Sequence, residues 1–152
     1  MNAATQTVRD ARPPTAVIML LNPIMRRVLR TPLGRLVKPF ALVEFTGRRS
    51  GRRYRVPVGW HVIDGTPVVF TPAPWRVNFA DATPVEVRHR GQVEAMTGTL
   101  VTDPELVASA LNTLFADGAP PRAVGLNMQS GHTVTATDVV AVDRAMIRFS
   151  RR

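Results

Sequence analysis

Short segments in which apolar and polar residues alternate follow one another from residue 40 to residue 101, and this pattern constrains the fold more than any other feature. Alternation with a period of two places one face of a strand in a core and the other in solvent. Asp64-Gly65 and Arg90-Gly91 separate neighbouring segments and predict tight hairpin turns. Strands are predicted over 40–46, 54–63, 68–71, 84–89, 92–101 and, later in the chain, 139–149. Many short strands with few helices favour an antiparallel barrel of the α+β class.

Two segments have helical spacing instead. Asp103-Pro104 predicts the start of a helix that continues to a stop at Gly118. Its apolar positions are Leu106, Val107, Ala110, Leu111, Leu114 and Phe115. Residues 16–38 predict an N-terminal amphipathic helix, preceded by a loose tail over 1–15. We expect 16–152 to form a single domain, in which the order of elements over 119–138 is not predicted.

The chain is strongly basic. Its 152 residues include 20 Lys and Arg against 11 Asp and Glu, which gives a net charge of +9. All the basic residues except Lys38 are arginines, and arginine pairs in bidentate fashion with phosphate and carboxylate groups. An anionic partner is therefore expected: a polyanionic small molecule, a membrane surface or a nucleic acid. Aromatic residues make up only 6% of the chain and predict no stacking platform, so we expect no nucleic acid partner.

Residues 16–38 carry much of this charge, because no acidic residue stands between Asp10 and Glu44. Two interpretations remain open for the segment. It lies on an anionic membrane surface, or it covers one end of the barrel with its arginines in solvent. Its apolar run over 17–21 is too short for a signal peptide or a membrane span. A cytoplasmic location is therefore expected, with peripheral membrane contact through 16–38 as the alternative.

Several kinds of chemistry are disfavoured. The chain has no cysteine, which excludes disulfides, thiolate metal sites and a cysteine nucleophile. His61, His89 and His132 do not stand at metal-ligand spacing, so no metal is expected. Ser130 and Asp138 lie near His132, but without a Gly-x-Ser-x-Gly elbow they predict a turn rather than a hydrolase triad. No acid–base constellation identifies catalytic residues.

A glycine-bounded turn between the first two predicted strands carries a dense group of cations. It reads Gly47-Arg48-Arg49-Ser50-Gly51, and two further arginines follow it. Glycines let backbone N–H groups approach an anion, Ser50 adds a hydroxyl donor, and the arginines add charge-assisted hydrogen bonds. These groups suit a phosphate, although no Gly-Lys-Ser/Thr follows and a Walker-type ATP site is not implied. The alternative is an exposed basic hairpin that binds nothing.

The strand after this turn has two different faces. Tyr54, Val56, Val58, Trp60 and Val62 share the face that suits a core. The other face carries Arg53, Arg55, Pro57, Gly59 and His61. It offers cations and a gap at the glycine over which a flat aromatic ring could lie.

Three features together resemble the deazaflavin-dependent nitroreductase family, which belongs to the split β-barrel flavin and deazaflavin oxidoreductases. They are the turn at 47–51, the motif Arg55-x-Pro57-x-Gly59, and the pair Trp75-x-x-Asn78. The Asn22-Pro23 dipeptide and the segment 84–91 also fit the family pattern. The resemblance covers roughly residues 20–102.

The resemblance implies a mainly antiparallel split β-barrel of six to seven strands, with an N-terminal amphipathic helix and one or two further helices. It also implies a homodimer and a polyanionic redox cofactor. That cofactor is coenzyme F-420, an 8-hydroxy-5-deazaflavin whose tail carries a phosphate and several glutamates, with FMN as the alternative. The reduced ring would pass a hydride to a small-molecule nitro, quinone or activated-alkene substrate.

The same resemblance assigns cofactor-binding residues. The turn residues Gly47, Arg48, Arg49, Ser50 and Gly51 would hold the phosphate and tail. Arg55, Pro57, Val58 and Gly59 would line the edge of the ring, and Trp75, Arg76 and Asn78 would lie on the far side of the site. The alternative function is a non-catalytic basic barrel that binds a flavin-like or haem-like ligand, a lipid or a membrane surface.

Overall fold

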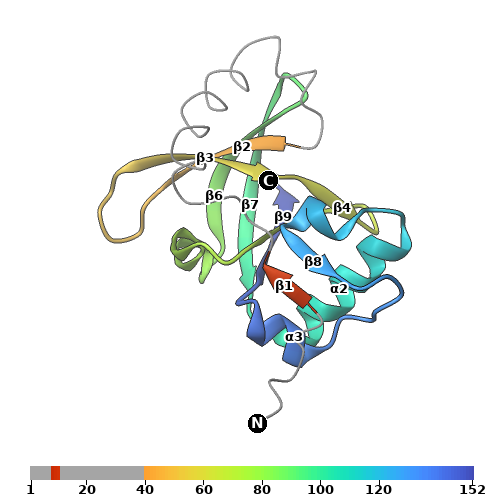
Figure 1. Cartoon of the computed structure of the whole chain (residues 1–152). Helices are drawn as coiled ribbons and strands as arrows, with labels where there is room; N and C mark the ends of the chain where they lie inside the picture. Colours follow the sequence, from red (N-terminus) through yellow and green to blue (C-terminus); the bar gives the residue numbers. More distant parts are fainter. Residues whose placement is uncertain (1–7, 11–39) are drawn as a thin grey trace.

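The structure is a computed structural model and describes residues 8–10 and 40–152 (Figure 1). The predicted helix over 16–38 and most of the predicted tail lie outside the described residues. Within that tail, Val8–Asp10 form strand β1. The strand pairs antiparallel with β8 (Leu126–Met128), and Val8 is fully buried there.

Seven strands form one antiparallel sheet that curls into a half-barrel, which confirms the expected α+β split barrel. Their order across the sheet is β3-β2-β6-β7-β9-β5-β4. The strands are β2 (Phe40–Thr46), β3 (Arg53–Gly59), β4 (His61–Ile63), β5 (Thr66–Thr71), β6 (Thr83–His89), β7 (Gln92–Val101) and β9 (Ala145–Arg151). All six predicted strands therefore correspond to strands of the sheet, and two of them change in the ways described next.

The predicted strand over 54–63 is broken at Trp60. Its first part, β3, pairs with β2, whereas its last part, β4, pairs with β5 at the opposite edge of the sheet. The predicted core face is buried only in the first part: Val58 is buried, whereas Val62 is 54% exposed and Ile63, of the opposite parity, packs against a hydrophobic core. The pattern therefore predicts the buried face of β3 but neither the change of partner nor the buried face of β4.

The predicted strand over 139–149 is wrong in its first half. Residues Ala136–Ala141 form helix α3, and β9 begins only at Ala145. Thr135 accepts a hydrogen bond from the Asp138 backbone N–H, and the Asp138 carboxylate accepts one from the Thr135 N–H. This capping box starts the helix and outweighs the strand preference of the β-branched residues that follow.

Helix α2 (Pro104–Ala116) lies where the sequence predicts a helix. Asp103 caps its N-terminus by accepting a hydrogen bond from the Glu105 N–H. Figure 1 shows α2, α3 and the β1–β8 pair gathered on one side of the sheet. Together with Val68 and Met146 of the sheet they enclose one apolar core. A second core fills the concave side of the half-barrel.

Phe79 attaches the 3-10 helix η2 (Pro74–Phe79) to this second core. Its ring is fully buried and lies edge-on to Phe45 and Phe149. The ring fits because β7 has a glycine beneath it: a Cβ atom at Gly98 would lie 2.6 Å from Phe79 Cδ1. Gly98 and Phe79 thus fix the position of η2, which carries the predicted site residues Trp75, Arg76 and Asn78.

We expect Gly98→Ala to destabilise the protein by about 1–3 kcal/mol, because the added methyl group overpacks the Phe79 ring. The free energy of unfolding from urea denaturation measures this effect. Val93→Ala on the same strand is the matched control, since Val93 is half exposed and should change stability by less than about 0.5 kcal/mol. Equal effects of the two substitutions would contradict the packing role of Gly98.

Candidate functional site

The arginine turn, defined as residues 47–52, joins β2 to β3 and closes on itself. The Gly47 N–H donates to the Arg52 carbonyl at 2.7 Å, and the Gly51 N–H donates to the Gly47 carbonyl at 3.0 Å. Gly51 has φ +68°, a backbone conformation that favours glycine. Gly47 is buried, and a Cβ atom there would lie 2.6 Å from the Tyr54 ring. Both glycines are therefore needed for the shape of the turn.

Helix η2 holds the arginine turn from one side. Asn78 Oδ1 accepts a hydrogen bond from the Arg48 N–H at 2.9 Å, while Asn78 Nδ2 donates to the Trp75 carbonyl at 2.8 Å. The Arg48 guanidinium donates to the Val77 carbonyl at 3.3 Å. The structure thus brings together Arg48, Trp75 and Asn78. From the sequence, only the family resemblance suggests that these three residues belong to one site.

Most backbone N–H groups of the arginine turn are engaged within the protein. Those of Gly47, Arg48 and Gly51 have the partners given above, and the Arg52 N–H donates to Ser50 Oγ at 3.2 Å. The backbone nest expected from the sequence is therefore largely filled. Two side chains of the turn remain able to bind a ligand. In the described part of the chain, neither the Arg49 nor the Arg52 guanidinium group has a hydrogen bond or an ion pair. Both are exposed beside the Ser50 hydroxyl, which lies 3.4 Å from the Tyr54 hydroxyl.

Arg55, predicted to line a cofactor ring, is instead paired with a buried carboxylate. Glu44 of β2 is only 4% exposed, and its Oε1 lies 3.5 Å from Arg55 Nε and 3.7 Å from Arg88 Nε. Its Oε2 accepts a hydrogen bond from Arg53 Nη2 at 3.1 Å. The Arg53 guanidinium also donates to Glu86 at 2.9 Å. The hydrogen bond to Glu44 is the main cause that raises the pKa of Arg53.

Sequence reasoning missed Glu44, although a signal was present. It is the single charged residue in the otherwise mostly apolar segment Phe40–Thr46. A carboxylate in such a segment, opposite a strand with two arginines of the same parity, predicts a cross-strand ion pair. The register confirms this geometry, since Glu44 lies directly opposite Arg55 on one side and Glu86 on the other.

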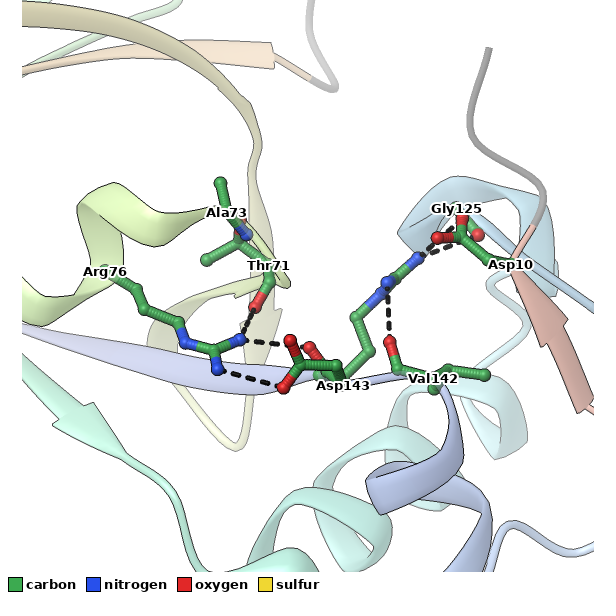
Figure 2. Close-up of polar contacts among 8 residues, drawn as sticks. Asp10, Thr71, Ala73, Arg76, Gly125, Val142 and Asp143 are labelled. Carbon is green, nitrogen blue, oxygen red and sulfur yellow. Dashed lines mark hydrogen bonds and ion pairs between the residues drawn. The ribbon is translucent and has the colours of Figure 1, made fainter. Parts of the chain in front are cut away.

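Arg76 also has a structural partner. Its guanidinium donates to the Asp143 carbonyl at 3.0 Å and to Asp143 Oδ1 at 2.9 Å, as Figure 2 shows. A longer hydrogen bond of 3.4 Å reaches the Thr71 carbonyl. The next residue, Arg144, is buried and donates to the carbonyls of Val142 and Gly125. Arg76 thus ties η2 to the start of β9.

The remaining predicted residues of β3 do not form an open ring surface. Val58 is buried in the concave core. A Cβ atom at Gly59 would lie 3.3 Å from His61 Nε2 and 3.5 Å from the Ala123 carbonyl oxygen, so the expected gap is occupied by the protein itself. Ala123 belongs to the 3-10 helix η3 (Pro121–Val124). Pro57 is half-buried opposite Leu42.

The pair formed by His132 and Asp138 has a structural role. His132 Nε2 lies 2.8 Å from Asp138 Oδ2, beside the capping box of α3. Desolvation raises the pKa of Asp138, but hydrogen bonds from His132 and Thr135 outweigh it, and the net pKa lies below its usual value. No serine hydroxyl among the described residues is hydrogen-bonded to His132. Residues 8–10 and 40–152 also contain no group of three His, Asp or Glu side chains placed to hold a metal ion.

Comparisons with known proteins add to the description of the fold. No protein-family model matches the chain, and no curated protein matches it. A solved structure titled as a domain-swapped dimer superposes with a TM-score of 0.51 at 16% identity, covering 91% of this chain and all of that one. An F420-H2-dependent reductase superposes with a TM-score of 0.49 at 19% identity, covering 74% of this chain and 95% of that chain.

A conserved hypothetical protein from Mycobacterium tuberculosis gives a TM-score of 0.48 at 14% identity, covering 94% of this chain and 83% of that chain. At these identities the likeness is one of fold. The fold and the site therefore define the class of molecule: a curled antiparallel half-barrel with a rigidly held, arginine-bearing turn. Within the described residues, no helix has the length and apolar composition needed to cross a membrane.

We expect Asn78→Ala to release the arginine turn while leaving the barrel folded. Two hydrogen bonds are lost, which should cost about 1–3 kcal/mol. Amide hydrogen exchange measured by NMR should show the Arg48 N–H exchanging at least tenfold faster, with the amides of β6 and β7 unchanged. The exposed Asn127→Ala is the control. A protected Arg48 amide in the Asn78 variant would show that η2 does not hold the turn.

His61 should make stability depend on pH. Burial lowers the pKa of His61 below 6.5, and a hydrogen bond to the Ala123 carbonyl opposes this only in part. The unfolded chain therefore takes up a proton below about pH 6.5 before the folded chain does, and the free energy of unfolding falls as pH drops through that window. His61→Gln can keep the hydrogen bond but does not titrate. Denaturation between pH 5 and 7.5 should show a smaller loss for this variant; parallel curves would contradict the assignment.

Proposed function

We propose that this chain is a cofactor-dependent oxidoreductase that uses the arginine turn to hold the anionic end of a reduced deazaflavin, coenzyme F-420. The observation that carries the proposal is the pair of exposed guanidinium groups, Arg49 and Arg52, on a turn held in shape by Asn78. A rigid backbone that presents unpaired arginines costs little ordering entropy when an anion binds. The motifs that resemble the deazaflavin-dependent nitroreductases include this turn.

The residues of the turn fit a phosphate. Arg49 and Arg52 can each donate charge-assisted hydrogen bonds, and the Ser50 hydroxyl can add one more. Nearby carboxylates do not neutralise these two side chains, because Glu44 and Glu86 are engaged by Arg53. Asp81, the acid nearest to Arg48, lies 3.6 Å from that guanidinium and is almost fully exposed. The anionic end of F-420 or of FMN therefore matches the donor set.

The contacts within the protein refine the roles of the predicted residues. Arg49, Ser50 and Arg52 would touch the phosphate, whereas Gly47, Arg48, Gly51 and Asn78 would keep the turn in the conformation that binds it. Arg55 and Arg76 are positioning residues, since each already pairs with a carboxylate. Pro57, Val58, Gly59 and Trp75 would contribute through the shape of β3 and η2 beside the turn.

When bound, a reduced deazaflavin supplies a hydride, and we propose a nitro group, a quinone or an activated alkene as the acceptor. The chain's own residues would bind and orient the cofactor and exclude water. FMN is the alternative cofactor for the same turn. A homodimer is also part of the proposal; the solved structure of similar fold is titled as a domain-swapped dimer, and light scattering after gel filtration measures the mass of this protein.

Reversing the charge of the turn tests the proposal. We expect the double variant Arg49→Glu, Ser50→Ala to bind F-420 about ten to a hundred times more weakly, because one or two charge-assisted hydrogen bonds are lost and a repulsive charge is added. Quenching of the deazaflavin fluorescence measures the dissociation constant. Arg122→Glu is the control: it makes the same change of charge at an exposed position of η3.

Two outcomes would overturn the proposal. One is no binding of F-420 or FMN by the wild type at high micromolar concentration. The other is equal affinity of the double variant and the control variant. Binding without turnover of nitroaromatic, quinone and enone substrates would leave the alternative, a basic barrel that binds a flavin-like ligand without catalysis.

A further inference from the structure

A groove of about 900 Å³ lies at the end of the half-barrel away from the arginine turn. Its position follows from the pairing of β9. Residues Val68–Thr71 of β5 pair with Ala145–Arg148, but Phe149–Arg151 pair only with β7, so the sheet opens along this part of β9. We call this space the Trp60 groove. Its lining includes Trp60, His89, Arg90, Glu94, Arg148 and Arg151.

None of the twelve residues predicted to bind a cofactor lines the Trp60 groove. The register shows the separation: His89 lies opposite Ala41 at one end of β2, whereas the arginine turn begins after Thr46 at the other end. Five residues of strand span roughly 17 Å. The groove is therefore a separate place on the molecule, and its use does not depend on the proposed function.

Aromatic rings form part of the groove wall. The Trp60 and Phe149 ring centroids are 5.0 Å apart with an interplanar angle of 41°, and the His89 ring lies 5.7 Å from Trp60 on the other side. Phe149, Met96 and Val87 are at most 3% exposed and form the buried floor beneath Trp60. Trp60 is only partly buried, so part of its ring remains accessible. A wall of this kind offers a planar aromatic ligand both apolar area and ring stacking.

The charges around the groove are mostly positive. Three arginines line it, Arg90, Arg148 and Arg151, against the single acid Glu94. Arg151 Nε lies 2.7 Å from Glu94 Oε1, which neutralises that pair. In the part of the chain that the structure describes, the side chains of Arg90 and Arg148 have no hydrogen bond or ion pair, and both are exposed. Two uncompensated cations beside an aromatic wall favour an anionic occupant.

We propose that the Trp60 groove binds a small planar aromatic carboxylate, with its ring against Trp60 and its carboxylate at Arg148 and Arg90. Guanidinium groups pair with carboxylates in bidentate fashion, and the apolar wall excludes water from the ring. A second copy of this chain is a poorer occupant, because each copy carries a net charge of +9 and the groove is itself cationic. A small anion relieves this repulsion instead of adding to it.

The two tryptophans of the chain make the test direct, since Trp60 lines the groove and Trp75 packs on Phe45 and Phe79 outside it. Protein labelled with ¹⁵N shows one indole N–H signal for each, assigned with Trp75→Phe. On titration with 2-naphthoate we expect the Trp60 indole signal to shift and saturate, while the Trp75 signal stays in place. The uncharged 2-naphthamide should bind at least fivefold more weakly.

Arg148→Gln should weaken 2-naphthoate binding at least fivefold, and Arg122→Gln should leave it unchanged; both side chains are exposed, so neither change should unfold the protein. The proposal is overturned if the Trp60 signal does not shift at millimolar 2-naphthoate, if the amide binds as well as the acid, or if the two variants bind equally. The variant Arg49→Glu, Ser50→Ala should bind 2-naphthoate as the wild type does, which separates this site from the arginine turn.

Discussion

The buried carboxylate of Glu44 is the interaction on which the arginine-rich half of the molecule depends. A carboxylate that is 4% exposed is costly unless it is paired, and here three guanidinium groups from β3 and β6 lie within 4 Å of it. Each of these arginines would otherwise repel its neighbours across the sheet. Glu44 therefore allows an edge strand with two arginines, Arg53 and Arg55, to pair with β2 along its whole length. Its Oε1 and the Arg88 Nε are both buried without a hydrogen bond and lie 3.7 Å apart, so these two atoms interact through charge alone.

This arrangement divides the cations of the described residues into two kinds. Arg53, Arg55, Arg76 and Arg144 are engaged by carboxylates or backbone carbonyls and hold elements of the fold together. Arg49, Arg52, Arg90 and Arg148 are exposed and have no such partner within the described part of the chain. A net charge of +9 alone predicts an anionic ligand but not where it binds. The pairing identifies the places, because only unpaired guanidinium groups can exchange water for a ligand without breaking an ion pair. Arg49 and Arg52 lie at one end of the half-barrel and Arg90 and Arg148 at the other, while Arg122 on η3 is a further exposed guanidinium group without such a partner in the described residues.

The sequence predicts the parts of the fold that depend on local signals. The strands on either side of Arg90-Gly91, the helix after Asp103-Pro104 and the turn at 47–51 all lie where residue spacing places them. The failures have two different causes. Trp60 ends a strand because the chain changes to a sheet neighbour that is distant in sequence. Val139 is helical because a local capping box, formed by Thr135 and Asp138, starts a helix and outweighs the strand preference of the residues that follow. At the candidate site the motif residues Arg48, Trp75 and Asn78 do come together. Arg55 and Arg76 are instead held by Glu44 and Asp143, and only the tertiary structure shows that each has a carboxylate partner.

The interior of the half-barrel explains why the arginine turn and the Trp60 groove coexist without disturbing each other. Ring contacts run from Tyr54 beside the turn through Phe45, Phe79 and Phe149 to Trp60 and His89 in the groove, with centroid distances between 4.9 and 6.3 Å. Close-packed rings of this kind form a stiff apolar layer, and the glycine at position 98 leaves room for the Phe79 ring in the middle of it. The layer buries the inward faces of β2 and β3, so that charged side chains project only at the ends and on the outer face. The cations of the arginine turn and those of the Trp60 groove are therefore separated by a packed aromatic interior.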